Sequence, residues 1–156
     1  MQVVNFLHPD SIILDMKART KMEALDELVD ALMKSGKVAD REKIRLAVIE
    51  REELYSTGFE NGVAIPHPRQ GQPAIVKEIV TAFGRSTAGI DFDSMDGELV
   101  HIFFMLCAPS DGEHLRALAR LSRLLKEKSF RDKLMAAKTP EEVIEAIANE
   151  EAKRSI

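Results

Sequence analysis

The nine residues that decide the fold class run from Val100 to Ala108, in the order Val-His-Ile-Phe-Phe-Met-Leu-Cys-Ala. Apart from His101 the stretch is apolar, and side chains alternate between the two faces of a strand, so both faces need to be covered. This pattern is typical of a buried central strand with helices packed on each side of its sheet. We therefore predict an α/β fold: a single-domain mixed β-sheet flanked by helices.

Three Ser/Thr-x-x-Glu patterns predict where helices begin, because the first hydroxyl caps the backbone N–H three residues later. They are Thr20 with Glu23, Ser110 with Glu113, and Thr139 with Glu142, the last with Pro140 at the first helical position. The first helix is predicted to end at Gly36 and to carry one apolar stripe: Met22, Leu25, Leu28, Val29, Leu32 and Met33. The helix that begins at Ser110 is predicted to run to about Lys126. Another helix is predicted from Asp40 to about Leu54, with Ile44, Val48 and Ile49 turned inward.

Shorter strands are predicted at residues 12–14, 63–65 and 79–83, with an irregular segment at 55–62 and a stiff loop at 66–69. The total is four or five helices alternating with four or five strands. No repeat, low-complexity tract or linker divides the chain. We therefore predict one domain over residues 1–156, with its core at about 10–150.

Composition excludes several classes of function. A net charge of −4 argues against a dedicated DNA- or RNA-binding surface. No uncharged apolar run reaches ~18 residues, so we expect neither a signal peptide nor membrane insertion, and a cytoplasmic protein. The lone Cys107 cannot form an internal disulfide and is predicted to be a buried thiol.

Of the four histidines, His67 is the strongest candidate for chemistry. It directly follows a short apolar strand, and the prolines on either side of it stiffen the loop that presents its ring. His114 falls on the apolar side of its helix, in the first turn, where the helix dipole favours a neutral ring. It is either a buried histidine bonded to a neighbouring backbone group or a partner that holds another ring or a phosphate oxygen. His8 is predicted to be exposed, and His101 to be a hydrogen-bonded core residue.

The residues around the His67 loop supply the positive charge and the N–H and O–H donors that bind phosphate. They are Arg51, Ser56, Thr57, Gly58, Asn61 and Arg69, all within 19 residues. Their concentration around a stiffly held imidazole predicts a histidine that accepts a phosphoryl group.

Other chemistries fit the sequence less well. The histidines and the cysteine lack the spacing of metal ligands, and neither a nucleotide-binding glycine motif nor a serine-hydrolase elbow is present. We expect no metal and no cofactor. Arg116, Arg120 and Arg123 form a stripe on the solvent side of the His114 helix, which is either solvated or docks an acidic protein partner.

The stretch from Arg51 to His67, Arg-Glu-Glu-Leu-Tyr-Ser-Thr-Gly-Phe-Glu-Asn-Gly-Val-Ala-Ile-Pro-His, resembles a known phosphohistidine motif. The motif is that of the fructose/mannitol-type enzyme IIA domains of the bacterial phosphoenolpyruvate-dependent sugar phosphotransferase system, which include the nitrogen-regulatory IIA proteins. Its most specific part is Gly62–His67, and Glu113-His114-Leu115 matches the segment that holds the family's second histidine. The resemblance covers nearly the whole chain.

The resemblance implies an α/β sandwich in which His67 is phosphorylated by the histidine phosphocarrier protein. The phosphate would pass on to a downstream IIB protein or a regulatory target. Arg51 matches an arginine near the phosphorylation site, and His114 matches the histidine beside the acceptor ring. We expect a neutral His67 to attack with one nitrogen while the other donates to an orienting acceptor. Arg51 would stabilise charge, and His114 would orient the reacting ring.

Two residues depart from the family pattern, which generally has a small residue, often glycine, where Glu60 and Pro68 stand. Pro68 removes a backbone N–H, and Glu60 adds negative charge. Two main hypotheses remain. One is a phosphoryl carrier in sugar transport or in regulation, with regulation favoured because the chain stands alone. The other is a non-catalytic IIA-like module that binds a regulatory target. A nucleic-acid-binding domain that uses the arginine stripe is disfavoured by the net charge.

Overall fold

Strand β5 (Val100–Cys107) lies in the middle of a five-stranded mixed sheet in the computed structural model, which describes residues 1–154. The strand order is β1-β4-β5-β3-β2. Strand β5 pairs antiparallel with β4 (Val80–Ile90) and parallel with β3 (Val63–Ala64). The edge strands are β1 (Leu7–Ile13), parallel to β4, and β2 (Gly58–Phe59), antiparallel to β3. The predicted mixed sheet is confirmed.

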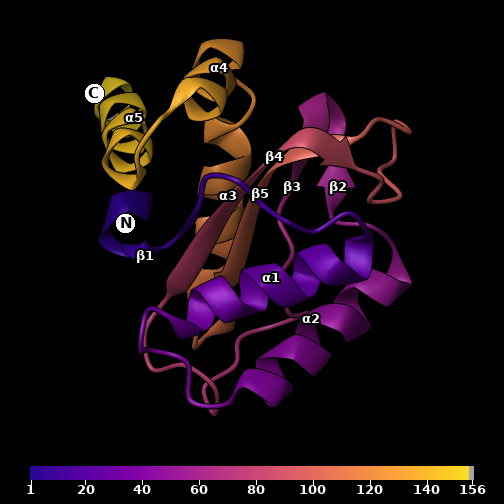
Figure 1. Ribbon diagram of the computed structural model, residues 1–156. Helices are drawn as coiled ribbons and strands as arrows, with labels where there is room; N and C mark the ends of the chain where they lie inside the picture. Colours follow the sequence, from indigo (N-terminus) through magenta and orange to yellow (C-terminus); the bar gives the residue numbers. More distant parts are fainter. Residues whose placement is uncertain (155–156) are drawn as a thin grey trace.

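Two hydrophobic clusters cover the two faces of β5, as its sequence predicts. Phe103, Met105 and Cys107 pack with apolar residues of α1 (Lys21–Met33) and α2 (Arg41–Leu54). The alternate residues of β5 pack with α3 (Asp111–Leu124), α4 (Lys128–Ala136) and α5 (Pro140–Lys153). Figure 1 shows α1 and α2 across one side of the sheet and α3 on the other. The result is the predicted α/β architecture, with helices on both faces.

The predicted helix starts are confirmed by cap hydrogen bonds. The side chains of Thr20, Ser110 and Thr139 accept from backbone N–H groups three residues later, at 3.2, 3.3 and 3.1 Å. Asp40 caps α2 in the same way, at 3.1 Å from the N of Lys43. Beyond the end of α1, Gly36 has a φ of 74°, which favours glycine because it has no Cβ. One position on the apolar stripe of α1 was wrongly predicted: Met22, in the first turn, is 45% exposed.

Strand lengths differ from the prediction where polar residues interrupt the apolar pattern. Strand β1 begins at Leu7 rather than near Ile12 and includes Pro9, which an edge strand tolerates because one row of its N–H groups needs no partner. Strand β4 continues past Phe83 to Ile90. The segment predicted to be irregular contains β2 and a single 3₁₀ turn, η2 (Glu60–Gly62).

A buried carboxylate joins the two ends of the chain. A short 3₁₀ helix, η1 (Val3–Asn5), lies beside α5 near the N-terminus (Figure 1). Glu151 of α5 is 1% exposed and accepts from the backbone N–H groups of Val3 and Val4, at 2.9 and 3.3 Å. It also pairs with Arg120, whose Nε lies 2.6 Å from its carboxylate. Arg120 therefore does not belong to a freely solvated stripe, whereas Arg116 and Arg123 are exposed.

We predict that Glu151→Ala lowers the free energy of unfolding by about 3 kcal/mol, because it leaves buried N–H groups and a half-buried guanidinium without their acceptor. Urea denaturation measures the loss. Glu145→Ala, at an exposed position of the same helix, is the control and should change stability by less than about 0.5 kcal/mol. Equal stabilities of the two variants would contradict the prediction.

Candidate functional site

His67 stands directly after the buried extension of β3, on a backbone held by the central strand. The N–H of Leu106 in β5 donates to the carbonyl of Pro66, at 3.0 Å, which continues the pairing beyond Ala64. The side chain of His67 is 7% exposed, and its Nδ1 lies 2.6 Å from the carbonyl oxygen of Ile65. Because a carbonyl only accepts, Nδ1 carries the proton and Nε2 keeps its lone pair. The ring is therefore held in one orientation and one tautomer.

His114 lies beside this ring, in the first turn of α3, as its helical position predicts. The two ring centroids are 5.1 Å apart, with an interplanar angle of 58°. His114 is 4% exposed, and its buried Nδ1 has no hydrogen-bond partner among residues 1–154. An unbonded buried nitrogen costs free energy, which is unusual in a group with a purely structural role. The hydrogen bond that orients His67 is accepted by the Ile65 carbonyl, so His114 contacts the His67 ring without fixing its tautomer.

Arg51, in the last turn of α2, reaches the same place from a different element. Its Nη1 donates to the carbonyl of Tyr55, at 2.8 Å, and its guanidinium carbon lies 4.3 Å from the centre of the Tyr55 ring. Arg51 and His67 both line a pocket of about 320 Å³. A cation therefore borders the space in front of the histidine, without a carboxylate partner in that lining.

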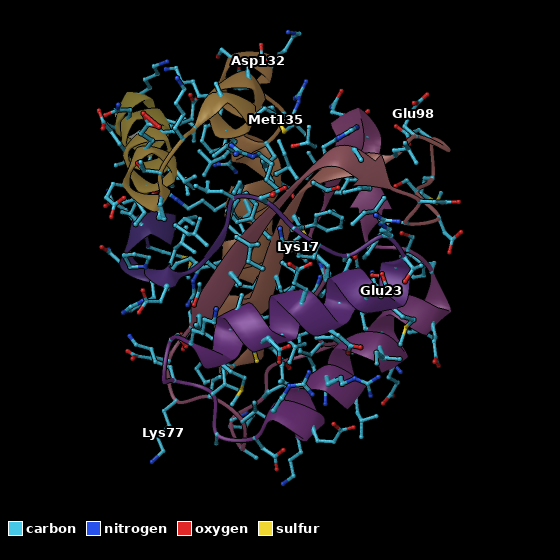
Figure 2. The ribbon with its side chains drawn as sticks, in the orientation of Figure 1. Lys17, Glu23, Lys77, Glu98, Asp132 and Met135 are labelled. Carbon is cyan, nitrogen blue, oxygen red and sulfur yellow. The ribbon has the colours of Figure 1, made fainter. Side chains whose placement is uncertain are left out.

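The pocket is assembled from segments that are far apart in the sequence. Its other lining residues are Tyr55, Ser56, Thr57, Gly58, Phe59, Ile65, Met95, Leu118 and Ser122. Met95 comes from the loop between β4 and β5, and Figure 2 shows Glu98 pointing outward from that same loop. Two larger hollows, of about 350 and 410 Å³, border no histidine and contain no comparable cluster of reactive groups.

Several of the predicted phosphate-binding groups are already bonded within the protein. The hydroxyl of Ser56 donates to the carbonyl of Phe92, at 2.6 Å, and accepts from the N–H of Gly58, at 2.9 Å. The hydroxyl and the N–H of Thr57 both donate to Glu52. These residues form the wall of the pocket, but the donors that the sequence suggested for phosphate are engaged elsewhere.

Two predicted site residues lie apart from the pocket. Asn61 is exposed and has a φ of 69° in η2, where its backbone makes a turn. Arg69 is exposed and borders a separate hollow with Glu50 and Gln72. Within residues 1–154, neither is among the residues that line the His67 pocket. The structure therefore brings together His67, His114, Arg51 and the 56–58 segment, and it adds Glu52, Met95 and Leu118, which no local pattern indicated.

Burial is the main reason why His67 is neutral. The pKa of His67 is lowered from 6.5 to about 4. Desolvation is the largest cause and the electrostatic effects of His114 and Arg51 act in the same direction, while the Ile65 carbonyl and Glu52 oppose them. Burial also lowers the pKa of His114, with Arg51 adding to the effect and Asp111 opposing it. Both rings are uncharged at neutral pH, so His67 has a lone pair available for attack.

The remaining histidines and the cysteine lie elsewhere. His8, on edge strand β1, has a side chain that is 44% exposed, as predicted. His101 is half-buried, and its Nδ1 donates to the carbonyl of Ser86, at 2.9 Å. Cys107 is buried as predicted, and burial raises the pKa of its thiol to about 12. Among residues 1–154, no three His, Cys, Asp or Glu side chains gather in a way that would hold a metal ion, and no helix is long and apolar enough to cross a membrane.

Comparison with known proteins agrees with this fold. Residues 5–150 match the family model for the phosphoenolpyruvate-dependent sugar phosphotransferase system, EIIA 2. The chain therefore belongs to this family, and it is a phosphoryl carrier of that system.

Similar relatives have both transport and regulatory names. A fructose-specific EIIA component from Haloferax volcanii is 37% identical over 139 residues, covering 88% of each chain. A nitrogen regulatory protein from Bradyrhizobium diazoefficiens is 33% identical over 150 residues, covering 95% of each. A fructose-specific EIIABC component from Bacillus subtilis is 37% identical over 149 residues. This match covers 94% of the present chain but only 23% of the length of the relative.

Solved structures share the fold. The nitrogen regulatory protein IIA-Ntr from Neisseria meningitidis superposes with a TM-score of 0.84 at 32% identity, over 93% of this chain and 98% of that one. The complex of enzyme IIAMTL and phosphorylated enzyme IIBMTL from Escherichia coli gives 0.75 at 24% identity, over 91% and 96% of the two chains. At 24% identity, the likeness to this second structure shows a shared fold and nothing more.

Because the folded His67 has a pKa of about 4 against 6.5 in the unfolded chain, only the unfolded chain binds this proton between those pH values. The free energy of unfolding should therefore be undiminished above pH ~6.5. It should fall by up to about 3 kcal/mol as the pH drops toward 4. Urea denaturation across this range tests it, with His67→Gln as the matched variant that lacks the titrating group. Parallel stability profiles for the two proteins would show that the pKa of His67 is not lowered.

Proposed function

We propose that His67 is the phosphoryl acceptor of this chain, reacting through Nε2, and that its donor is the histidine phosphocarrier protein. The single observation that carries the proposal is the 2.6 Å hydrogen bond from Nδ1 to the Ile65 carbonyl, on a ring that burial keeps neutral. That bond leaves Nε2 as the basic nitrogen, and the ring lines a pocket bordered by a cation. The ring is therefore held in one orientation and is neutral, which suits it to attack through Nε2.

The proposed transfer balances without a metal or nucleotide, because the phosphate arrives already activated on nitrogen. A bond forms between Nε2 of His67 and phosphorus while the bond from phosphorus to the donor's ring nitrogen breaks, and that nitrogen takes back its electron pair. The His67 ring gains positive charge as it attacks, and the short bond from Nδ1 to the Ile65 carbonyl stabilises that charge. No proton has to leave His67.

Arg51 and His114 would act on the phosphoryl oxygens. The transition state of phosphoryl transfer is loose and spreads charge over these oxygens, so catalysis consists mainly of positioning and charge neutralisation. Arg51 supplies the positive charge from the pocket wall. His114, whose ring centre is 5.1 Å from that of His67, is near enough to offer a hydrogen bond to a phosphoryl oxygen.

The rim of the pocket favours a protein partner over a small molecule. Tyr55 and Met95 line the pocket and are 65% and 82% exposed, and Leu115, next to His114 in sequence, is 63% exposed. Large exposed apolar side chains around a reactive group are typical of docking surfaces. A IIB protein or a regulatory target fits this surface as the downstream acceptor, in keeping with the solved complex of a IIA and a phosphorylated IIB. We place the exchange in the cytoplasm and favour a regulatory role, on the likeness of the fold to the nitrogen regulatory protein IIA-Ntr, with a TM-score of 0.84. The fructose-specific relative, 37% identical over 88% of its length, keeps sugar transport as the alternative.

The alternative of a non-catalytic binding module rested on Glu60 and Pro68. Glu60 is exposed, and neither residue is among those that line the His67 pocket in the described chain. Their departure from the family pattern therefore puts no negative charge in the pocket wall. A phosphoryl carrier is the function that the site favours.

We predict that His67→Ala abolishes phosphorylation by phosphoenolpyruvate, the general phosphotransferase enzyme and the phosphocarrier protein. His114→Ala should slow it by about a hundredfold, because one hydrogen bond that stabilises the transition state is lost. Intact mass spectrometry of the acid-labile phosphoryl group gives the rates. His8→Ala, on the opposite edge of the sheet, is the control and should react like the wild type. Normal phosphate uptake by His67→Ala would refute the assignment.

A second prediction concerns the atom that is modified. Phosphorylation should shift the ¹⁵N resonance of His67 Nε2 to the position of a phosphorylated nitrogen, while Nδ1 stays protonated and bonded to Ile65. Nitrogen-15 NMR of histidine-labelled protein, before and after phosphorylation, distinguishes the two nitrogens. Phosphate on Nδ1 would mean that the bond to Ile65 breaks before the reaction.

A further inference from the structure

Glu52 is a buried carboxylate immediately behind the pocket, next in sequence to Arg51. It is 5% exposed and lies near the end of α2. Its two oxygens make three contacts. One oxygen accepts from the N–H of Thr57, at 2.8 Å, and lies 3.0 Å from Nζ of Lys21, while the other accepts from the Thr57 hydroxyl. Both hydrogen-bond donors of Thr57 are thus tied to a single side chain.

From Thr57, backbone hydrogen bonds lead directly to the reactive ring. The carbonyl of Thr57 accepts from the N–H of Ile65, at 3.3 Å, and the carbonyl of Ile65 accepts from Nδ1 of His67, at 2.6 Å. Between Thr57 and Ile65 the chain forms the small β2–β3 pair, only two residues long in each strand. Such a short pair is marginal by itself, so the position of the Ile65 carbonyl depends on what holds Thr57.

The same carboxylate fixes the outer wall of the pocket through Lys21. Nζ of Lys21 lies 3.5 Å from Asp93 and 5.0 Å from the centre of the Phe92 ring. Phe92 in turn accepts, through its carbonyl, from the hydroxyl of Ser56. The segments on both sides of the pocket, 55–58 and 92–95, are therefore joined at Glu52.

Stability alone does not explain a buried charge at this position. Removing a carboxylate from water is costly, and well-packed apolar residues in place of a buried ion pair are often equally stable or more so. What an apolar residue could not do is accept two hydrogen bonds from Thr57 in a fixed direction. The chemistry of Glu52 therefore fits orientation better than it fits stabilisation.

We infer that Glu52 is a positioning residue, which holds Thr57 and, through it, the Ile65 carbonyl that sets the tautomer and direction of His67. The inference rests on the proposed phosphoryl transfer to His67. The charge of Glu52 opposes the lowering of the His67 pKa, but the ring is neutral in spite of it, so the proposed role rests on the geometry of the Glu52 oxygens.

Two substitutions separate geometry from charge. Glu52→Gln removes the charge but can keep all three contacts: its oxygen accepts from the Thr57 N–H and from Lys21, and its amide donates to the Thr57 hydroxyl. Glu52→Asp keeps the charge but is one methylene shorter, so it cannot reach both groups of Thr57. Glu151→Asp is the matched control, because Glu151 is an equally buried carboxylate that accepts from backbone N–H groups and pairs with a cation at the other side of the fold.

The experiment measures single-turnover phosphorylation of each variant by the phosphorylated donor protein, at increasing donor concentration, together with the ¹⁵N spectrum of His67. Glu52→Asp should lower the maximal rate by about tenfold to a hundredfold, since small misplacements of a nucleophile have effects of that size. Its half-saturating donor concentration should stay within about twofold, because the docking rim is unchanged. The ¹⁵N resonances of its His67 should move toward a mixture of the two tautomers. Glu52→Gln and Glu151→Asp should both behave like the wild type.

The outcomes test the phosphoryl transfer to His67 and the positioning role of Glu52 separately. A wild-type protein that takes up no phosphate refutes the proposed function itself. If the wild type reacts, three results overturn the positioning role of Glu52: an Asp variant as fast as the wild type, a Gln variant as slow as the Asp variant, or a Glu151→Asp control slowed to the same extent. Only a slow Asp variant with altered His67 resonances, beside a normal Gln variant, supports it.

Discussion

Strand β5 is apolar on both faces, and much of the molecule is arranged to keep water from it. Helices α1 and α2 cover one face, and α3, α4 and α5 cover the other. Strand β3 is short, but it lies against β5, and the Leu106 to Pro66 hydrogen bond carries that pairing to the residue before His67. The loop that carries His67 is therefore attached to the buried centre of the sheet. This hydrogen bond to β5 restrains the backbone next to His67.

Burial determines the protonation state of His67 as well as the shape of the site. His67 is 7% exposed, so its ring loses the hydration that stabilises an imidazolium and remains neutral, as the proposed nucleophile must be. The same burial restricts access, and the pocket in front of the ring leaves the approach open to a partner. Phosphoryl transfer between proteins needs both properties together: a lone pair that is available at neutral pH, and a surface on which the partner can dock.

Two buried carboxylates illustrate how similar chemistry has different consequences in different places. Glu151 binds the N-terminal 3₁₀ helix to α5 and affects the stability of the fold. Glu52 binds the segment that pairs with the His67 loop, so its hydrogen bonds are linked through Thr57 to the position of Ile65. Each is paired with a cation, which offsets the cost of burying its charge. What distinguishes them is the segment that each one holds.

The amino-acid sequence by itself determined the features that depend on neighbours within a few residues. The caps at Thr20, Ser110 and Thr139, the two-faced apolar strand β5 and the stiff loop at His67 are of this kind, because side-chain alternation and cap hydrogen bonds are local.

Only the tertiary structure decided which groups meet in front of His67. It turned the Ser56 and Thr57 hydroxyls toward Phe92 and Glu52, placed Asn61 and Arg69 outside the pocket lining, and brought Met95 and Leu118 into that lining. Nearness in sequence does not predict these hydrogen-bond partners or which residues line the pocket. These hydrogen bonds and contacts join segments that are far apart in the sequence, so they form only when those segments pack together around β5.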